Sequence, residues 1–378
     1  MAYDLVVKRG TVVDPSQGVH GICDVAFSRG KVAAVEEAIP ESEAREVIDA
    51  SGLIVTPGLV DLHVHAYWGV STFGIDADDT CLARGVTTLV DAGSAGAATF
   101  AGFRRYVLET KKTRILPFLH ISAMGLLHRE IQELQDMRWA DVAAAVRVGK
   151  EHADIILGIK VRLTDTIVNG KDIEALTRSL EAAEQLEKPV MVHIGNTPSP
   201  LSRILEMMRP GDIITHAFTG RAHNILDEEG NVLPEVRQAR ERGILFDQGH
   251  GAGSHSFDVA EKALAQGFPP GTISSDLHVY SLEQPVHDLA TCLSKYMRFG
   301  MSLDEVVRLS TEAPAKVVGM AREIGTLKVG AEGDCALFCM EEGRFTFTDS
   351  YGNTTEGTER LVPVNTIKGG EVYRPAGG

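Results

Sequence analysis

The feature that most constrains the fold is a regular alternation of strand-like and helix-like segments between residues 57 and 324. Apolar strand candidates recur eight times, at 59–65, 87–93, 114–122, 155–163, 189–195, 212–218, 243–249 and 272–278. Amphipathic segments of helical period lie between them, at 139–152, 171–186, 234–242, 257–266 and 302–320. Strands that alternate with helices favour a parallel sheet with helices outside, and eight such units predict an α/β fold, a closed (β/α)8 TIM barrel.

The two ends of the chain have a different pattern, in which short strands are separated by turns. Residues 3–55 contain several such strands, and the pattern returns after residue 325. Because the termini of compact chains often lie close together, we expect both ends to form one small flanking β-sandwich. The predicted domains are therefore a composite β-sandwich of residues 1–55 and 325–378 and a barrel of residues 56–324.

Composition and charge exclude several classes of partner. The chain has a net charge of −15, which disfavours nucleic acid and anionic membrane because both bind clustered Lys and Arg. It has no apolar run of the ~20 residues that a membrane span needs and no apolar signal-peptide core. Five scattered cysteines argue against a disulfide framework. We expect a cytoplasmic protein that binds small molecules; a homo-oligomer is compatible with the sequence, which contains no interface pattern.

The first barrel strand ends in two histidines, His63 and His65. Side chains in a strand alternate between its faces, so the two imidazoles point to the same side and can hold one metal ion together. The alternative is a pair of buried, hydrogen-bonded imidazoles.

Further metal-ligating residue types stand where other predicted strands end. Strand four carries Lys160, strand five ends at His193, strand six at His216 and strand eight at Asp276. The active site of a (β/α)8 barrel lies where its strands end, at the C-terminal face, so these side chains are expected on one rim. The combined set favours a metal centre over a collection of structural histidines.

Lys160 requires a change of charge, because an ammonium group would be repelled by cations and cannot donate an electron pair. A neutral lysine amine can add carbon dioxide, and the resulting carbamate carries one negative charge and two oxygens, enough to bridge two ions. The alternative is an ordinary ammonium group in an ion pair, with a single ion held by the histidines and Asp276.

The stretch Pro-Gly-Leu-Val-Asp-Leu-His-Val-His at 57–65, together with the later lysine, histidines and aspartate, resembles the amidohydrolase superfamily over nearly the whole chain. The six-ligand set is similar to the binuclear, dihydroorotase-like subtype. This resemblance implies that His63, His65 and Asp276 hold one zinc ion, that His193 and His216 hold another, and that Lys160 bridges them as a carbamate. Such ligands also bind other divalent metals, so the ion itself stays open.

The mechanism expected for such a centre is hydrolysis. Two divalent ions lower the pKa of water enough to present a bridging hydroxide near neutral pH, and one ion polarises the substrate carbonyl. Asp276 is the expected catalytic residue: it would take the proton of the attacking hydroxide and pass it to the leaving group.

Three residues are candidates for substrate binding. Arg162 shares a strand face with Lys160 and could bind a substrate carboxylate, or form a rim salt bridge. Tyr67 follows the histidine pair and could contact substrate or cap a barrel loop. His250, framed by glycines after strand seven, could hydrogen-bond substrate or serve loop structure. The roles of His120, His223, His255 and His278 stay open.

Two resemblances bear on the substrate. Dihydroorotases have His-x-His-x-Arg where this chain has Tyr67, which argues against a cyclic ureide. The Gly-His-Gly stretch at 249–251, with Gly158-Ile-Lys-Val-Arg and Ser275-Asp-Leu-His, resembles a branch described as amidohydrolase/deacetylase. That resemblance implies removal of an acyl group, especially acetyl, from a small carboxylate-bearing amide or ester. The alternatives are a cyclic amide hydrolase of the dihydroorotase or hydantoinase kind and a catalytically silent scaffold of the same fold.

Overall fold

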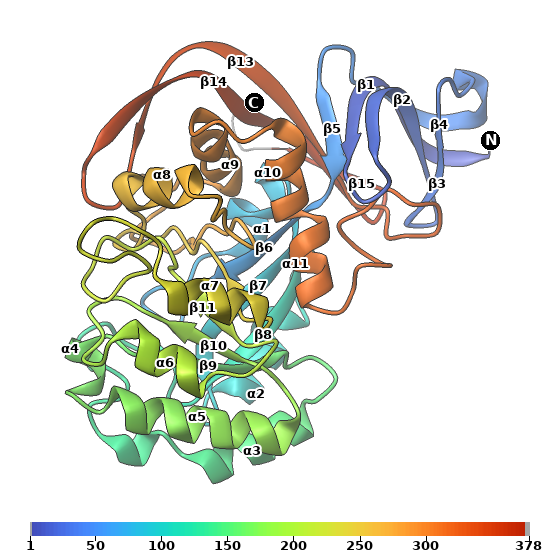
Figure 1. Cartoon of the computed structure of the whole chain (residues 1–378). Coiled ribbons are helices and arrows are strands. Elements are labelled where there is room, and N and C mark those ends of the chain that lie inside the picture. The colour runs from blue at the N-terminus through green and yellow to red at the C-terminus, as the bar shows by residue number, and fades with distance from the viewer. Residues whose placement is uncertain (1, 375–378) are drawn as a thin grey trace.

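A computed structural model describes residues 2–374 and contains two β-sheets, one in the barrel and one beside it (Figure 1). The barrel sheet is parallel and has seven strands in the order β12-β11-β10-β9-β8-β7-β6. Their bounds are β6 Leu59–Val64, β7 Val86–Gly96, β8 Arg114–His120, β9 Gly158–Arg162, β10 Val190–His193, β11 Ile213–Thr215 and β12 Leu245–Phe246. The predicted barrel class is confirmed.

The eighth barrel segment, residues 272–278, closes the sheet without forming a regular strand. It makes isolated parallel bridges on both sides, between Asp247 and Thr272 and between Val64 and Leu277. Backbone hydrogen bonds reinforce the closure, including one of 2.7 Å from the Asp276 N–H to the carbonyl of His63. The first and last strands therefore lie side by side, and this brings the ends of both to one rim.

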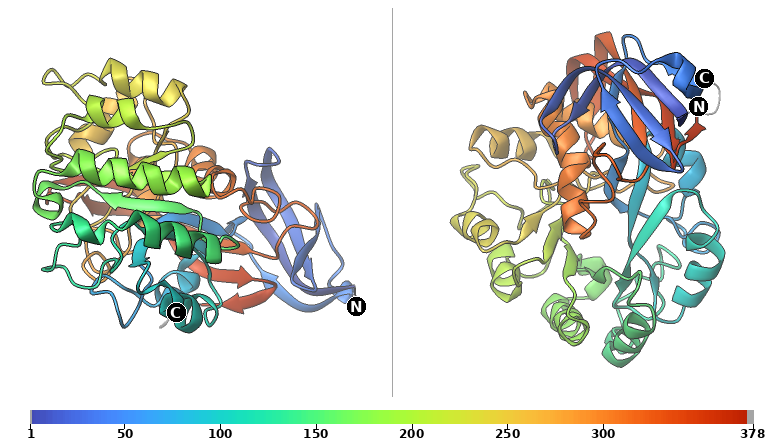
Figure 2. Two further views of the ribbon diagram at one scale, coloured as in Figure 1. Left: turned by 90° about the horizontal axis from the view of Figure 1, so that it is seen from below. Right: turned by 90° about the vertical axis from the view of Figure 1, so that its right-hand side faces the viewer.

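Helices surround the barrel sheet (Figure 2). Their bounds are α1 Ala77–Thr80, α2 Phe100–Phe103, α3 Val142–Glu151, α4 Asp165–Val168, α5 Asp172–Leu186, α6 Leu201–Met207, α7 Pro234–Glu241, α8 Phe257–Ala265, α9 Leu289–Arg298, α10 Leu303–Ser310 and α11 Glu312–Val317. Four short helical turns supplement them, η1 Glu41–Glu43, η2 Leu82–Arg84, η3 Arg104–Leu108 and η4 Met137–Trp139. The single helix predicted at 302–320 is wrong, because Pro314 would clash with the carbonyl of Ser310 in a continuous helix.

The flanking sheet joins the two ends of the chain, in the order β15-β14-β13-β5-β1-β2-β3 with β4 paired to β1. Its strands are β1 Tyr3–Asp14, β2 Val19–Ser28, β3 Lys31–Glu36, β4 Ala44–Asp49, β5 Ile54–Pro57, β13 Cys335–Thr348, β14 Thr354–Lys368 and β15 Glu371–Tyr373. The junction is the antiparallel pairing of β5 with β13.

Two parts of this sheet differ from the expected short strands. β1 is continuous over 12 residues, and an irregularity between Val7 and Gly10 accommodates Arg9 at φ +62°. β13 and β14 are 14 and 15 residues long and form a hairpin that extends past α8 and α9 (Figure 1). Its tip, residues 349–353, reaches the loops of the barrel rim.

The barrel interior beneath the rim is apolar. Leu62, Val90, Phe118, Met191 and Ile213 form one buried cluster. Met191 is the register partner of Lys160 in the neighbouring strand, so Lys160 stands on the same sheet face as this cluster.

Candidate metal centre and active site

Side chains from the first and last barrel segments meet at one rim. His63 lies in β6, His65 directly follows that strand, and Asp276 lies in the closing segment. Oδ1 of Asp276 is 3.3 Å from Nε2 of each histidine. Both imidazoles therefore point to the same side of the strand, toward one carboxylate.

His193 and His216 complete the cluster from the middle of the sheet. Their ring centroids lie 4.1 Å apart, and the ring of His216 lies 5.0 Å from that of His63. The ligand atoms of His63, His216 and Asp276 all lie within 4.8 Å of one another, a spacing that suits a shared cation. The four histidines and the aspartate expected at the rim are thus neighbours in space.

Lys160, in β9, is fully buried, and its Nζ has no hydrogen-bond partner among the described residues 2–374. Burial lowers the pKa of its amine to about 7, although the nearby carboxylate of Asp276 acts in the opposite direction. A buried polar group without a partner is costly unless something absent from the polypeptide satisfies it.

Gly93 makes room for this lysine. A Cβ at Gly93 would lie 2.6 Å from both Cβ and Cγ of Lys160, and Gly93 itself has φ +83°. Only glycine fits a left-handed position this close to another side chain. The neighbouring strand is therefore shaped around Lys160.

Hydrogen bonds orient the histidine rings. The hydroxyl of Thr215 donates to Asp247 Oδ2 (2.8 Å), so it accepts a hydrogen bond from His63 Nδ1 (2.7 Å). Nδ1 of His216 donates to the carbonyl of Gly249 (2.6 Å). Both contacts place the ring proton on Nδ1 and leave the Nε2 lone pair free, as the hydrogen-bond partners of metal-binding histidines do.

The imidazoles are also electrostatically prepared to be ligands. Burial lowers the pKa of His65 to about 3 and that of His216 to about 4, and it lowers the pKa of His63 well below its usual value. Neutral imidazole is the form that coordinates a metal. Nε2 of His216 and Oδ1 of Asp276 lack hydrogen-bond partners among residues 2–374, so the donor set fits divalent cations.

Two of these donors stand on strained backbone. His216 has φ +67° and Asp276 has φ +47°, a left-handed conformation that is uncommon for residues with a side chain. A Cβ at Gly251, which has φ +56°, would lie 2.2 Å from Oδ2 of Asp276. Strain of this kind concentrates at functional sites, where the surroundings hold it in place.

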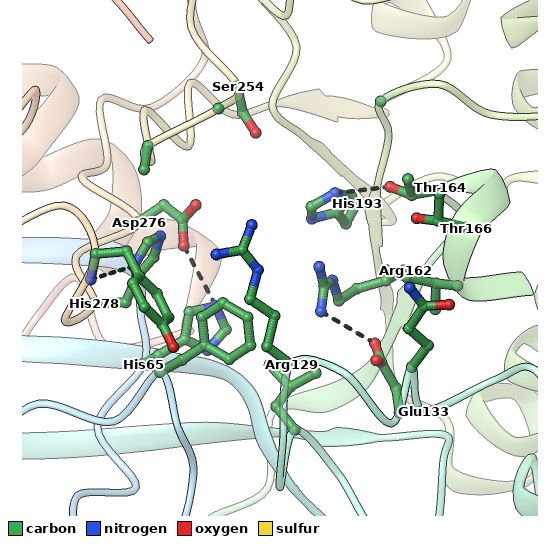
Figure 3. A pocket seen from close by; sticks show the side chains of 18 of the residues that line it. His65, Arg129, Glu133, Arg162, Thr164, Thr166, His193, Ser254, Asp276 and His278 are labelled. Carbon is green, nitrogen blue, oxygen red and sulfur yellow. Dashed lines mark hydrogen bonds and ion pairs between the residues drawn. The ribbon is translucent and has the colours of Figure 1, made fainter.

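A cavity of about 530 Å³ opens over His65, His193 and Asp276 (Figure 3). Lys160, His63 and His216 lie deeper and are fully or almost fully buried. The other lining residues include Phe73, Arg129, Glu133, Arg162, Arg221 and Tyr280. The cavity gives a small molecule access to the buried donors.

Arg162 lines the cavity but already has a carboxylate partner. Its Nη1 lies 3.3 Å from Oε1 of Glu133, which is itself 3.5 Å from Nε2 of His120. Burial alone would raise the pKa of Glu133, yet Arg162 and His120 outweigh it and lower that pKa to about 2. Arg162 therefore forms the rim salt bridge that was the alternative to substrate binding.

Tyr67 and His250 lie outside the residues that line the cavity. The ring of Tyr67 packs 4.5 Å from that of Phe103, and its hydroxyl donates to the carbonyl of Thr99 (3.1 Å). His250 is buried, with Nε2 2.8 Å from Nζ of Lys295. These contacts favour the structural alternative for both residues.

The hairpin tip of the flanking sheet supports the loop beside the cavity. The hydroxyl of Tyr351 accepts a hydrogen bond from the Gly220 N–H (2.9 Å) and donates to the carbonyl of Gly253 (3.2 Å). The hydroxyl of Ser350 donates to the carbonyl of Gly251 (2.8 Å). Since Gly253 lines the cavity, the flanking sheet helps to shape its wall.

The four histidines of open role have different surroundings. His120 is fully buried beside Glu133, and His278 lines the cavity with its ring 6.2 Å from that of His65. Nδ1 of His223 lies 2.9 Å from the carbonyl of Thr197 at the surface. His255 is buried with its ring 4.5 Å from that of His250.

Sequence reasoning missed Arg129, Glu133 and Arg221. Arg129 and Glu133 lie in the long irregular segment between β8 and η4, and Arg221 lies in the loop after His216. Their only signal in the sequence is position, because loops that follow barrel strands form the active-site face.

The chain matches the model of the Amidohydrolase family over residues 54–373. It belongs to the amidohydrolase family. A deacetylase of Agrobacterium fabrum is 36% identical over 343 residues, which cover 90% of this chain and 84% of that protein. A deacetylase of Enterococcus faecalis is 33% identical over 99% of this chain and the whole of its own length. The amidohydrolase resemblance is confirmed, and the chain is a hydrolase.

Solved structures show the same architecture. One described as an adenine deaminase matches with a TM-score of 0.89 and 32% identity, over 98% of this chain and 100% of its own. One described as a dihydroorotase matches with a TM-score of 0.90 and 34% identity, over 98% and 97%. Among residues 2–374 of this chain, no helix has the length and apolarity that crossing a bilayer requires.

Proposed function

We propose that this amidohydrolase is a binuclear metal-dependent enzyme that removes an acyl group, acetyl in particular, from a small carboxylate-bearing amide or ester. The observation that carries the proposal is the fully buried Nζ of Lys160, which has no partner among residues 2–374 and shares a rim with four histidines and Asp276. A buried amine in that position is explained if it becomes a carbamate that bridges two cations.

The proposed ligand sets are those that the amidohydrolase resemblance implies, and the close spacing of His63, His216 and Asp276 is compatible with two adjacent cations. His63, His65 and Asp276 would hold one ion, and His193 and His216 the other, with Lys160 between them as the carbamate. Zinc is the expected metal because it favours imidazole and carboxylate ligands at low coordination number. Bound divalent ions supply Lewis acidity, which polarises a carbonyl and makes water nucleophilic near neutral pH.

The chain's own residues would orient the substrate and move the proton. Asp276 lines the cavity, and its carboxylate can take a proton from the attacking water and pass it to the leaving nitrogen or oxygen. The cavity of about 530 Å³ restricts the substrate to a small molecule.

The acyl chemistry is supported by the two deacetylase-named relatives, which match at least 90% of this chain. A second candidate is ring opening of a cyclic amide, favoured by the 34% identity to the structure described as a dihydroorotase. Tyr67 argues against the usual cyclic ureide, because it stands where dihydroorotases have arginine. A cytoplasmic location is supported by five free cysteines, none of them in a disulfide.

The test combines metal analysis with a substrate panel. We expect two divalent ions per chain, and turnover of N-acetyl or O-acetyl carboxylates but not of dihydroorotate, hydantoins or adenine. Ring opening alone would select the second candidate. Two bound metals without any turnover would contradict the acyl proposal, and absence of metal would favour a silent scaffold.

Asp276→Asn tests the proton-transfer role. The variant should retain most of its metal and lose about 10²- to 10⁴-fold in kcat, since an amide cannot accept the proton. Asp304→Asn, at an exposed ion pair with His20 outside the cavity, is the matched control and should keep full activity. Full activity in Asp276→Asn would rule out the assigned role.

A further inference from the structure

Arginine side chains are concentrated in the cavity of a strongly acidic protein. The whole chain carries a net charge of −15, yet Arg129, Arg162 and Arg221 all line the cavity. Among the described residues 2–374, the only carboxylates in that lining are those of Glu133 and Asp276. Three guanidinium groups against two carboxylates give the lining an excess of positive charge, and a positively charged cleft concentrates anionic ligands. The cavity is therefore suited to an anion, and Arg162 and Arg129 differ in their freedom to bind one.

Arg162 is the least free of the three. It is partly buried, and its Nη1 pairs with Glu133, whose side chain is only 7% exposed. Its guanidinium also lies over the ring of Phe73, with its central carbon 5.6 Å from the ring centroid. Removing Arg162 from Glu133 would leave a buried carboxylate with His120 as its remaining partner, which is costly. Arg162 therefore stabilises the cavity wall.

Arg129 has the opposite environment. Its side chain extends into the cavity between Asp276 and Arg162 (Figure 3), and within the described part of the chain it forms no ion pair. Its guanidinium carbon lies 5.4 Å from the centre of the Tyr280 ring, a contact that restricts the side chain and leaves its N–H groups available. Its backbone N–H donates to Thr72 Oγ1 (3.2 Å), which ties the loop to the first barrel segment.

We infer that Arg129, and not Arg162, binds the carboxylate of the substrate and determines the preference of this enzyme for anionic acyl compounds. The inference rests on the proposed acyl hydrolysis, which places the scissile carbonyl at Asp276. A guanidinium with free donors can grip a carboxylate in bidentate fashion, and an unpaired arginine needs no ion pair to be broken first.

The experiment compares a carboxylate with its uncharged carboxamide. The metal-loaded protein is offered N-acetyl amino acids and the matching N-acetyl amino acid amides, and the best pair is used for all variants. Where the enzyme turns the pair over, the ratio of the two kcat/KM values is measured; where it does not, the ratio of the two Kd values is measured by calorimetry. Loss of turnover with an intact Kd ratio would overturn the proposed function but not this inference.

We expect wild-type protein to prefer the carboxylate by about 10- to 100-fold, the range of a charge-assisted hydrogen-bond pair. Arg129→Met should abolish that preference by weakening only the carboxylate. Arg129→Lys should retain part of it, because the charge remains and the planar fork is lost. Arg162→Met should weaken both compounds together and lower the thermal midpoint.

Arg138→Met is the matched control, since Arg138 lies in η4, directly after the segment that contains Arg129, but is 88% exposed and pairs with Asp136. It should keep the wild-type ratio. A carboxylate preference that survives in Arg129→Met, or that disappears only in Arg162→Met, would overturn the inference. So would a wild-type protein without any preference.

Discussion

Two buried lysines, one in the flanking sheet and one in the barrel, have opposite surroundings. Lys8, in β1, is 7% exposed, and its Nζ lies 2.7 Å from Oδ2 of Asp24 and also contacts the carbonyl of Ile39. Lys160, in β9, is 0% exposed and has no hydrogen-bond partner among residues 2–374. The same residue type is thus fully paired in one region and unpaired in the other.

The difference separates a structural role from a chemical one. An ammonium ion taken from water needs acceptors, and Lys8 finds a carboxylate and a carbonyl. A third buried lysine follows the same rule: Nζ of Lys295 contacts His250 and the carbonyls of Pro285 and Thr348 at 2.7 to 2.8 Å. Lys160 alone among these three lacks such partners, which is why we assign its amine to the metal centre.

The largest effect is expected from Lys160→Met, which removes the unpaired amine and conserves much of its volume. The metal content should fall from two ions to at most one, and kcat/KM should fall at least ~10³-fold, as loss of several kcal/mol of Lewis-acid stabilisation implies. The free energy of unfolding of the metal-free protein should not decrease, because no native hydrogen bond is lost. Metal analysis, kinetics and denaturant unfolding of the same preparation measure the three quantities; lower metal-free stability would indicate an ordinary structural lysine.

Lys8→Met should have the reverse profile. Breaking a buried pair from one side leaves the Asp24 carboxylate unpaired, so the free energy of unfolding should fall by about 3 to 5 kcal/mol. Metal content and activity per folded molecule should stay at wild-type values, because Lys8 lies in the flanking sheet. Urea unfolding, metal analysis and activity assays of the same preparation check this. A selective loss of metal in Lys8→Met would contradict the assignment of Lys8 to a structural role alone.

Thr215→Val tests whether the hydrogen bonds that orient the rim histidines increase metal affinity. The Thr215 hydroxyl links His63 Nδ1 to Asp247, and loss of such a partner typically costs about 10- to 100-fold in metal affinity. Titration with a competing chelator measures that affinity. Thr366→Val, at a buried hydroxyl that accepts from the Gly85 N–H, is the matched control and should leave metal affinity unchanged.

The smallest effect concerns acid stability. Burial opposes ionisation of Asp24, but Lys8 and the backbone N–H groups of Ile39 and Arg9 outweigh it and lower the pKa of Asp24. In the unfolded chain the Asp24 carboxyl has a pKa of ~3.9, so it binds a proton at a higher pH there than it does in the folded protein. The pair's contribution is therefore complete above that pH and is lost as pH falls through the folded pKa. In Lys8→Met the free energy of unfolding should depend less steeply on pH in this acidic range. A pH dependence equal to that of the wild type would contradict the pairing of Lys8 with Asp24.

The barrel and its donor set follow from the sequence because strand ends fix both. His63, His193, His216 and Asp276 each end a predicted strand, and a closed barrel brings strand ends to one rim. The break between α10 and α11 was also readable, since Pro314 cannot continue a helix. Periodicity could not show the break, because the buried residues Val306, Ser310 and Pro314 follow one continuous helical spacing across it.

Other features depend on tertiary contacts that the sequence does not encode locally. Glu133 pairs with Arg162 from an irregular segment without periodicity, so strand alternation alone could not decide between a substrate-binding Arg162 and a rim salt bridge. Tyr67 shares strand spacing with the histidines, yet it packs on Phe103 once the chain leaves β6. The length of the β13–β14 hairpin was hidden because charged residues interrupt its apolar alternation.

The most direct test of the central claim is carbon-13 NMR of the metal-loaded protein prepared with labelled bicarbonate. We predict one bound carbamate resonance per chain in the wild type, which disappears in Lys160→Met together with at least one metal ion. Two bound metal ions in wild-type protein without a carbamate resonance would contradict the assignment of Lys160 as the bridge.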